Sequence, residues 1–150
     1  MLSEKISKDY IEAMKARNSL KVSVLTMLKS AVKYEEIDNR EKGKELTDDD
    51  VMSVIQREIK KREESIAMYK QAERNDLASK EEEELAILRA YLPEQLSEKE
   101  VEEIISKIIA EIGADGKKDF GRVMKVAVSE LKGRADSNII RQVAEKLLSR

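Results

Sequence analysis

The chain has 150 residues, of which 41% are apolar and 40% are charged, and its formal net charge is −2. It contains no cysteine and no histidine, which excludes disulfides, thiolate chemistry and histidine-based acid–base or metal chemistry. Five glycines and one proline are few for a β protein, whereas abundant Glu, Lys, Leu, Ala and Ile favour long helices. We therefore predict an all-α fold.

Two amphipathic helices are predicted at the start of the chain. Apolar residues recur at helical spacing over residues 2–17 and again over residues 20–38. Between these helices, Asn18 or Ser19 can cap the second one through a side-chain oxygen. The polar stretch 40–45 is predicted to be a loop.

A helical hairpin is predicted over residues 48–92. Thr47 precedes three aspartates and is the predicted N-cap of a long helix, whose apolar seam has one charged interruption, Arg62. The stretch 74–76 is expected to end this helix and to cap the next one. The acidic run 81–84 is predicted to be a solvated face rather than a metal site, because no metal-ligand spacing accompanies it.

The chain's single proline disfavours helix at the residue before it, and a hinge is predicted over residues 93–96. This hinge separates an N-terminal helical domain, 1–92, from a C-terminal three-helix module, 97–150. Ser97 and Glu100 have the spacing of a capping box, which would begin the fifth helix.

Glycines and one aspartate mark the predicted helix boundaries of the C-terminal module. Gly113 is predicted to end the fifth helix, and the stretch 116–118 leads into the sixth. Gly133 is predicted to end the sixth helix as a left-handed cap, and Asp136 to cap the seventh.

No catalytic residue, metal site or cofactor is predicted. The stretch 116–121 has the first glycine spacing of a phosphate-binding P-loop, but Arg122 and Val123 stand where that loop needs Lys and Ser or Thr. Acid pairs such as Glu98 and Glu102 share a helical face. Nothing in the sequence indicates the apolar pocket that would raise the pKa of one of them for acid–base catalysis.

No apolar run approaches the ~20 residues of a membrane span. The N-terminus also lacks the basic-then-apolar layout of a signal peptide. We therefore expect a cytoplasmic protein that does not contact a membrane.

Basic side chains concentrate in the last part of the chain. Residues 113–150 carry nine basic and five acidic side chains, whereas acids exceed bases by six in residues 1–112. The candidate nucleic-acid-binding residues are Lys117, Lys118, Arg122, Lys125, Lys132, Arg134 and Arg141. Such groups can bind a sugar-phosphate backbone by position and charge rather than by base identity. The alternative is that 133–136 is only a junction of two helix caps, with lysines solvating the surface.

Two segments near the end of the chain are the most specific of several that match a known family. They are Asp119-Phe120-Gly121-Arg122-Val123-Met124 and Leu131-Lys132-Gly133-Arg134-Ala135-Asp136. With these segments, essentially the whole chain resembles the YqeY-like proteins. That family shares its fold with the C-terminal tail of the B subunit of the bacterial tRNA-dependent amidotransferase (the GatB/YqeY group).

The resemblance implies an all-α, two-domain protein whose C-terminal module belongs, in the amidotransferase, to a tRNA-recognising tail. It does not carry over the amidotransferase chemistry, because nothing in this chain matches the catalytic residues. Three positions depart from the pattern expected of the family: Lys125, Glu130 and Ser137. Glu130 weakens the basic face.

Three functions follow as hypotheses. The first is a non-catalytic protein that interacts with tRNA or is an accessory to tRNA-dependent amidation. The second is a protein-interaction adaptor that uses the 48–92 hairpin as its contact arm. The third is an accessory subunit of a carbon–nitrogen ligase with glutamine as amido-N-donor. This third label rests on the resemblance only, and any such activity would need other subunits.

Overall fold

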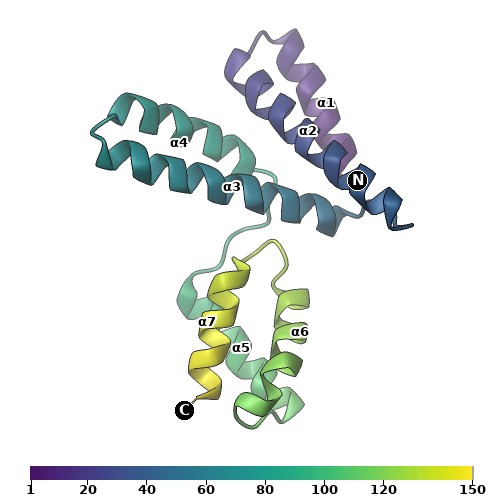
Figure 1. Cartoon of the computed structure of the whole chain (residues 1–150), viewed down its shortest axis with the longest axis vertical. Coiled ribbons are helices and arrows are strands. Elements are labelled where there is room, and N and C mark those ends of the chain that lie inside the picture. The colour runs from purple at the N-terminus through teal and green to yellow at the C-terminus, as the bar shows by residue number, and fades with distance from the viewer. Residues whose placement is uncertain (150) are drawn as a thin grey trace. The chain divides into compact units, whose positions relative to one another are not determined.

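The structure, a computed structural model, describes residues 1–149. Within these residues the chain forms seven α-helices and one short 3₁₀ helix and contains no β-strand, so the predicted all-α class is confirmed. The chain divides into two compact units, Met1–Leu92 and Pro93–Arg150, and each unit has its own apolar core. Figure 1 shows the order of the helices along the chain.

The first unit consists of two helical hairpins. Its helices are α1 (Leu2–Lys15), α2 (Ser19–Glu41), α3 (Asp48–Gln71) and α4 (Asn75–Arg89). Helices α1 and α2 pack together, and α3 packs along α4 (Figure 1). The two hairpins share one core, because Leu25 of α2, Ile55 of α3 and Leu88 of α4 are all fully buried in the same cluster.

The turn between α1 and α2 is set by local backbone chemistry. Helix α1 ends at Lys15, two residues before its predicted end, and Arg17 adopts a positive φ of 55°. The side chain of Asn18 accepts a hydrogen bond from the backbone N–H of Lys21 at 3.1 Å. Asn18, rather than Ser19, is therefore the cap of α2.

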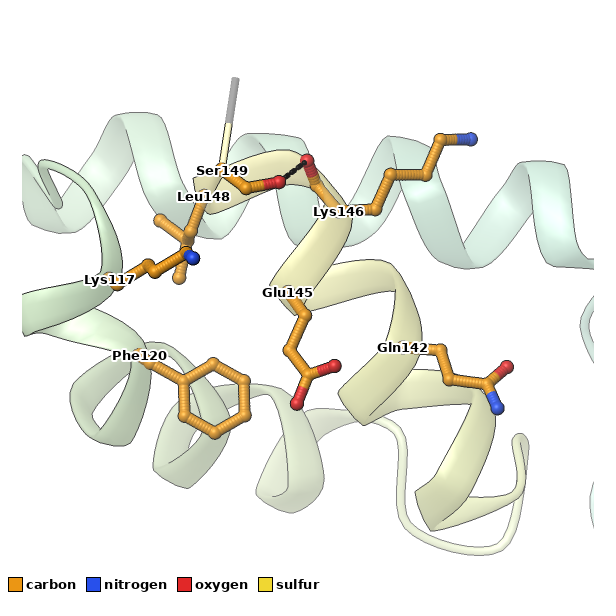
Figure 2. Close-up of a pocket in the computed structure, with 7 residues that line it drawn as sticks. All are labelled: Lys117, Phe120, Gln142, Glu145, Lys146, Leu148 and Ser149. Carbon is orange, nitrogen blue, oxygen red and sulfur yellow. Dashed lines mark hydrogen bonds between the residues drawn. The ribbon is translucent and has the colours of Figure 1, made fainter.

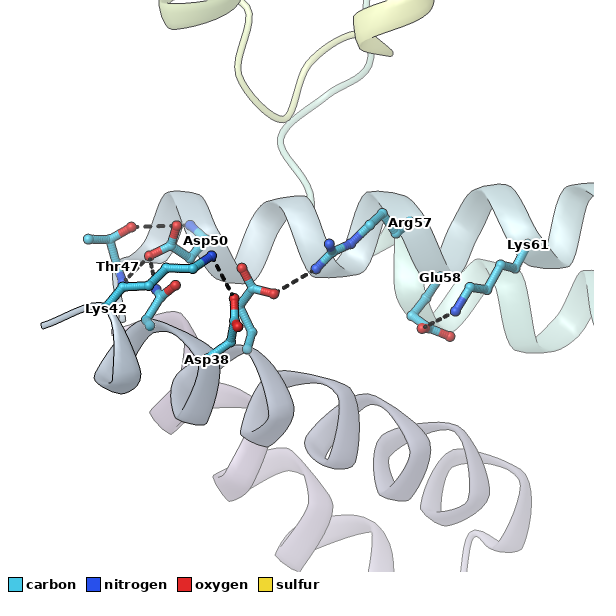
Figure 3. Close-up of polar contacts among 9 residues, drawn as sticks. Asp38, Lys42, Thr47, Asp50, Arg57, Glu58 and Lys61 are labelled. Atoms are coloured by element: carbon cyan, nitrogen blue, oxygen red, sulfur yellow. Dashed lines mark hydrogen bonds and ion pairs between the residues drawn. The ribbon is translucent and has the colours of Figure 1, made fainter. Parts of the chain in front are cut away.

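Helix α2 extends three residues beyond its predicted end and stops at Glu41. An ion pair of 3.0 Å between Asp38 and Lys42, one helical turn apart, supports the extra residues (Figure 3). The buried Asn39 also donates a hydrogen bond of 3.0 Å to Asp50 at the start of α3. The predicted loop therefore begins later than expected, because contacts with α3 favour the added turn.

Helix α3 begins with a capping box, which confirms the prediction that Thr47 is its N-cap. The Thr47 hydroxyl accepts a hydrogen bond from the backbone N–H of Asp50, and the Asp50 carboxylate accepts one from the backbone N–H of Thr47. Further along α3, Arg57 reaches Glu35 of α2 at 2.9 Å. Figure 3 shows Thr47 and Asp50 at the start of α3 and Arg57 further along the same helix.

A buried ion pair joins α3 to α4. Arg62 interrupts the apolar seam of α3 and is only 7% exposed. It pairs with Glu84, which is equally buried, and with Glu81 at 3.1 Å. The prediction that the run 81–84 is a solvated face is therefore wrong for Glu84 and Glu81. These two acids lie three residues apart and so point to the same side of α4, where Arg62 supplies their counter-charge.

The break before α4 also differs from its prediction. Glu73 adopts a positive φ of 58°, which ends the path of α3, and α4 begins at Asn75. No side chain caps this helix within the described residues, since Arg74 occupies the cap position and its guanidinium pairs instead with Asp76 at 3.3 Å.

The second unit is a three-helix bundle. Its elements are α5 (Glu98–Ile112), the 3₁₀ helix η1 (Lys117–Asp119), α6 (Phe120–Glu130) and α7 (Ser137–Leu148). The core is lined by fully buried side chains from all three α-helices, among them Ile105, Val123 and Ile140. Figure 1 shows α5, α6 and α7 side by side.

Three of the predicted caps in this unit are confirmed, one of them in part. Gly113 ends α5 with a left-handed φ of 66°, and Asp136 caps α7 by accepting a hydrogen bond from the backbone N–H of Asn138 at 2.7 Å. Ser97 caps α5 through the N–H of Glu100 at 3.2 Å. The Glu100 carboxylate returns no bond within the described residues, so the capping box is half formed.

The end of α6 is a correction to the predicted boundary. The helix stops at Glu130, and Gly133, with a φ of 76°, lies in the turn that follows rather than at the cap. Leu131 and Ala135 are both buried in the core of the unit. The chain leaves the helical path early because the turn must bring both of these side chains inward.

The segment 93–96, predicted to be a hinge, is attached to that same turn. The Gln95 side chain donates a hydrogen bond of 2.6 Å to the carbonyl of Gly133. The backbone N–H of Leu96 donates one of 2.9 Å to the carbonyl of Arg134. These bonds make the segment part of the second unit.

None of the helices in the described part of the chain combines the length and the apolar composition that a bilayer crossing requires.

Candidate nucleic-acid interface

The seven predicted basic residues lie on four elements of the second unit. Lys117 and Lys118 are in η1, Arg122 and Lys125 on α6, Lys132 and Arg134 in the α6–α7 turn, and Arg141 on α7. The structure therefore gathers most of them along α6 and its two ends, and leaves Arg141 on a separate helix.

Three of these residues form a row on the outward face of α6. Helix η1 runs directly into α6, so Lys118, Arg122 and Lys125 follow one another at spacings of four and three residues. All three side chains are exposed, whereas Val123 and Ala127, on the opposite face, are completely buried. We call this row, together with Gly121 between its members, the α6 face.

The lysines of the α6 face differ from its arginine in their ion pairing. Lys118 and Lys125 form no ion pair within residues 1–149. Arg122 differs, because it pairs with Asp119 at 3.2 Å and donates a second hydrogen bond to the carbonyl of Ile112 at 3.2 Å. Arg122 is thereby held in one place, while the two lysines remain available to an outside anion.

Asp119 is the one acid in contact with this row within the described residues. It accepts a hydrogen bond of 2.8 Å from the backbone N–H of Asp115, which is the main reason that its pKa lies below the ordinary value. Arg122 and the nearby Lys118 lower that pKa further. Asp119 therefore stays ionised at neutral pH and offsets part of the charge of Arg122.

Lys132 and Arg134 lie at the other end of α6. An 11-residue helix is about 16 Å long, so this turn is well separated from Lys118. Both side chains are half-buried and neither forms an ion pair within residues 1–149. Since the carbonyls of Gly133 and Arg134 bind the segment 93–96, this turn has a structural role that is independent of any ligand.

Gly121 is a residue of the α6 face that charge counting did not identify. Its backbone is helical, and a Cβ built at this position would meet no atom within 4 Å. Neither backbone conformation nor packing therefore requires glycine here, although glycine in a helix costs about 0.5–1 kcal/mol relative to alanine. A glycine without a packing reason suits a surface that another molecule's backbone approaches closely. Its sequence signals were its place in the incomplete P-loop spacing and in the segment 119–124 that resembles the family.

Within residues 1–149, no group of three or more His, Cys, Asp or Glu residues is arranged to hold a metal ion.

Comparison with known proteins finds relatives over nearly the whole chain. Residues 3–148 match the model of the Yqey-like protein family. An uncharacterized protein of Schizosaccharomyces pombe is 38% identical over 92 residues, which are 61% of this chain and 72% of the relative. A protein of Pyrenophora tritici-repentis named altered inheritance of mitochondria protein 41, mitochondrial, is 28% identical over 148 residues, 96% of this chain and 79% of the relative.

A protein of the same name from Lachancea thermotolerans is 30% identical over 109 residues, which are 71% of this chain and 57% of the relative. Because these two relatives are named as mitochondrial, the expected cytoplasmic location of this chain stays a prediction.

Proposed function

The chain belongs to the YqeY-like protein family, and from this premise we propose that it is a non-catalytic RNA-binding protein that holds tRNA against the α6 face. The observation that carries the proposal is the pair of exposed lysines, Lys118 and Lys125, on either side of Gly121, neither of which forms an ion pair within residues 1–149. In this role the protein would act as an accessory to tRNA metabolism, and any link to tRNA-dependent amidation would need other subunits.

The chemistry of the α6 face suits a phosphodiester backbone. Lysine ammonium groups neutralise phosphates at several points along a strand without reading the bases. Gly121 leaves room for sugar and phosphate atoms to approach the helix backbone. The resemblance of the module to a tRNA-recognising tail supports tRNA over other polyanions. The net excess of basic side chains after residue 112 favours the same partner class.

The test is the salt dependence of tRNA binding by the purified protein. Each neutralised phosphate contributes about −0.9 to the slope of log affinity against log salt concentration on a duplex. Three contacts therefore predict a slope of roughly −3. Binding titrations over a range of ionic strengths measure this slope. If no salt-sensitive binding occurs even at low ionic strength, the proposal is abandoned.

A second candidate function is a protein-interaction adaptor that uses the α3–α4 hairpin. Met68 lies near the hairpin tip and is 69% exposed, so it offers an apolar contact to a partner of the hairpin. Pull-down from cell lysate with and without nuclease separates the two functions, because an adaptor keeps its partner when RNA is destroyed. Glutaminase activity from the purified chain would contradict the non-catalytic assignment.

Replacing Gly121 by alanine is expected to move stability and binding in opposite directions. The added methyl group meets open space, so the free energy of unfolding should rise by about 0.5 kcal/mol through helix propensity. The affinity for tRNA should fall, because the methyl group occupies the space of an approaching backbone. Thermal unfolding and binding titrations measure the two effects.

The matched control for Gly121→Ala is Ser106→Ala on the exposed side of α5. This change also raises helix propensity in the second unit but lies off the α6 face, so it should leave tRNA affinity unchanged. Equal affinities for the Gly121→Ala and Ser106→Ala variants would show that no ligand comes close to Gly121.

A further inference from the structure

A hollow lies beside the α6 face, between the start of α6 and the end of α7. Its volume is about 590 Å³, and it is open to solvent. Lys117 and Phe120 line it on one side, and Glu145 and Leu148 of α7 line it on the other (Figure 2). A volume of this size is within the usual range of small-molecule sites, roughly 300–1,000 Å³.

The walls of the hollow offer three different kinds of contact. Phe120 is half-buried against the core and presents its ring beside the hollow, with Leu148 as a second apolar contact (Figure 2). The Glu145 carboxylate is exposed and is directed toward the same space. Lys117 supplies a positive charge at the edge that leads to Gly121, because these residues lie four positions apart.

The two charges of the hollow are available to a ligand. Neither Glu145 nor Lys117 forms an ion pair within residues 1–149. Lys146 also borders the hollow, but its ammonium group is engaged by Glu102 at 2.8 Å. The arrangement therefore combines an aromatic face with the carboxylate of Glu145 and the ammonium group of Lys117, and Gln142 adds a side-chain amide to the same lining.

We propose that this hollow binds a single unstacked base of an RNA strand, with a preference for guanine. The base stacks on Phe120, and the neighbouring phosphate pairs with Lys117, from which the strand continues over Gly121 onto the α6 face. This inference rests on the proposed RNA-binding function and identifies the part of the ligand that the α6 face does not contact.

Guanine fits the acceptor better than the other bases. It alone among the four presents two adjacent N–H donors, at N1 and N2, along one edge. A carboxylate accepts two parallel donors through its two oxygens, so Glu145 can bind that edge in a bidentate manner. Adenine, cytosine and uracil each place an acceptor next to their donor on the same edge, which a carboxylate repels.

A cationic side chain of a protein partner is the competing occupant, since an aromatic ring next to a carboxylate attracts cations. Lys117 argues against it. Its ammonium group extends into the same hollow (Figure 2) and would repel a second cation by about 1 kcal/mol at 4 Å even in water. A nucleotide, by contrast, places a phosphate that the Lys117 ammonium group attracts.

The experiment measures the affinity of the full chain for four short single-stranded RNAs of identical length. Each is oligouridine with G, A, C or U at the central position. The wild-type protein should bind the G-containing probe most tightly. Phe120→Leu should weaken that binding about 5- to 100-fold, as expected for the loss of one base–aromatic stack, and Phe120→Tyr should retain it.

Glu145→Gln should lower affinity for the G-containing probe and raise affinity for the all-U probe, because the carboxylate no longer repels the acceptors of uracil. Because Glu145 is exposed, this variant tests the proposal even if Phe120→Leu fails to fold. The salt slope should be unaltered in Glu145→Gln and Phe120→Leu, because neither change removes a phosphate contact.

The outcomes separate this inference from the proposed function. Salt-sensitive tRNA binding with no base preference, and with no effect of Phe120→Leu or Glu145→Gln, overturns the base subsite and leaves the RNA-binding function standing. If the protein binds no tRNA, the proposed function fails. Guanosine monophosphate then tests the hollow by itself: selective shifts of the Phe120 ring resonances would support the subsite, and unchanged resonances would overturn it.

Discussion

Replacing Glu84 by alanine is expected to lower the free energy of unfolding by about 3 kcal/mol, the lower end of the range for breaking a buried ion pair. The change removes the nearest partner of Arg62 and leaves a guanidinium that is only 7% exposed. Glu81, at 3.1 Å, remains as a partial counter-charge, which is why the higher end of the range is not expected. Chemical denaturation measures the loss.

The chain offers a matched control for this prediction. Arg89 and Glu63 also join α4 to α3, at 2.7 Å, but both side chains are half exposed. Glu63→Ala should therefore cost under about 1 kcal/mol, as is usual for surface pairs. If Glu84→Ala and Glu63→Ala lower the free energy of unfolding equally, burial does not make the Arg62–Glu84 pair more important than a surface pair.

A double replacement separates the net contribution of the Arg62–Glu84 pair to stability from the cost of leaving one of its charges unpaired. The Nε of Arg62 is buried and has no hydrogen-bond partner among residues 1–149, so the pair is not fully satisfied. Arg62→Met combined with Glu84→Leu removes the two buried charges and should recover most of the stability lost in Glu84→Ala, because Glu81, whose side chain is 24% exposed, stays in contact with solvent. If the double variant is as unstable as the single one, packing rather than the unpaired charge explains the loss.

Reversing the charge of Lys118 and Lys125 together is expected to weaken tRNA binding roughly 100-fold at low salt and to reduce the salt slope by about 2. Both side chains are exposed, so the fold should be unaffected. Binding titrations of Lys118→Glu/Lys125→Glu at several ionic strengths measure both quantities.

Lys60→Glu/Lys80→Glu is the control for that double variant. These lysines are exposed on α3 and α4 of the first unit, and the change in net charge is the same. An equal loss of affinity in this control would mean that overall charge, rather than the α6 face, governs binding. Lys132 and Arg134 are less suitable for such a test, because both are half-buried in a turn that binds the segment 93–96.

Much of the second unit and part of its candidate site follow from local rules. The candidate cations were identified from charge, and the shared face of Arg122 and Lys125 follows from helical spacing. What charge could not reveal is that Asp119 pairs with Arg122, whereas Lys118 and Lys125 form no ion pair in the described part of the chain. That distinction depends on which acids the folded chain brings within reach.

The sequence by itself determined the helical class and several helix ends, among them Thr47, Gly113 and Asp136. These features are local: a side-chain oxygen caps backbone groups two or three residues away, and a glycine adopts a left-handed conformation without help from distant residues. Their prediction needs no knowledge of how helices pack.

Only the tertiary structure decided the features that join distant parts of the chain. Arg62 and Glu84 are 22 residues apart, and Gln95 and Gly133 are 38 apart. Phe120 and Glu145 share a hollow although they belong to different helices. Periodicity tells which face of a helix is buried but not which residue of another helix lies opposite. Counter-charges and pockets therefore emerge only when the helices are packed together.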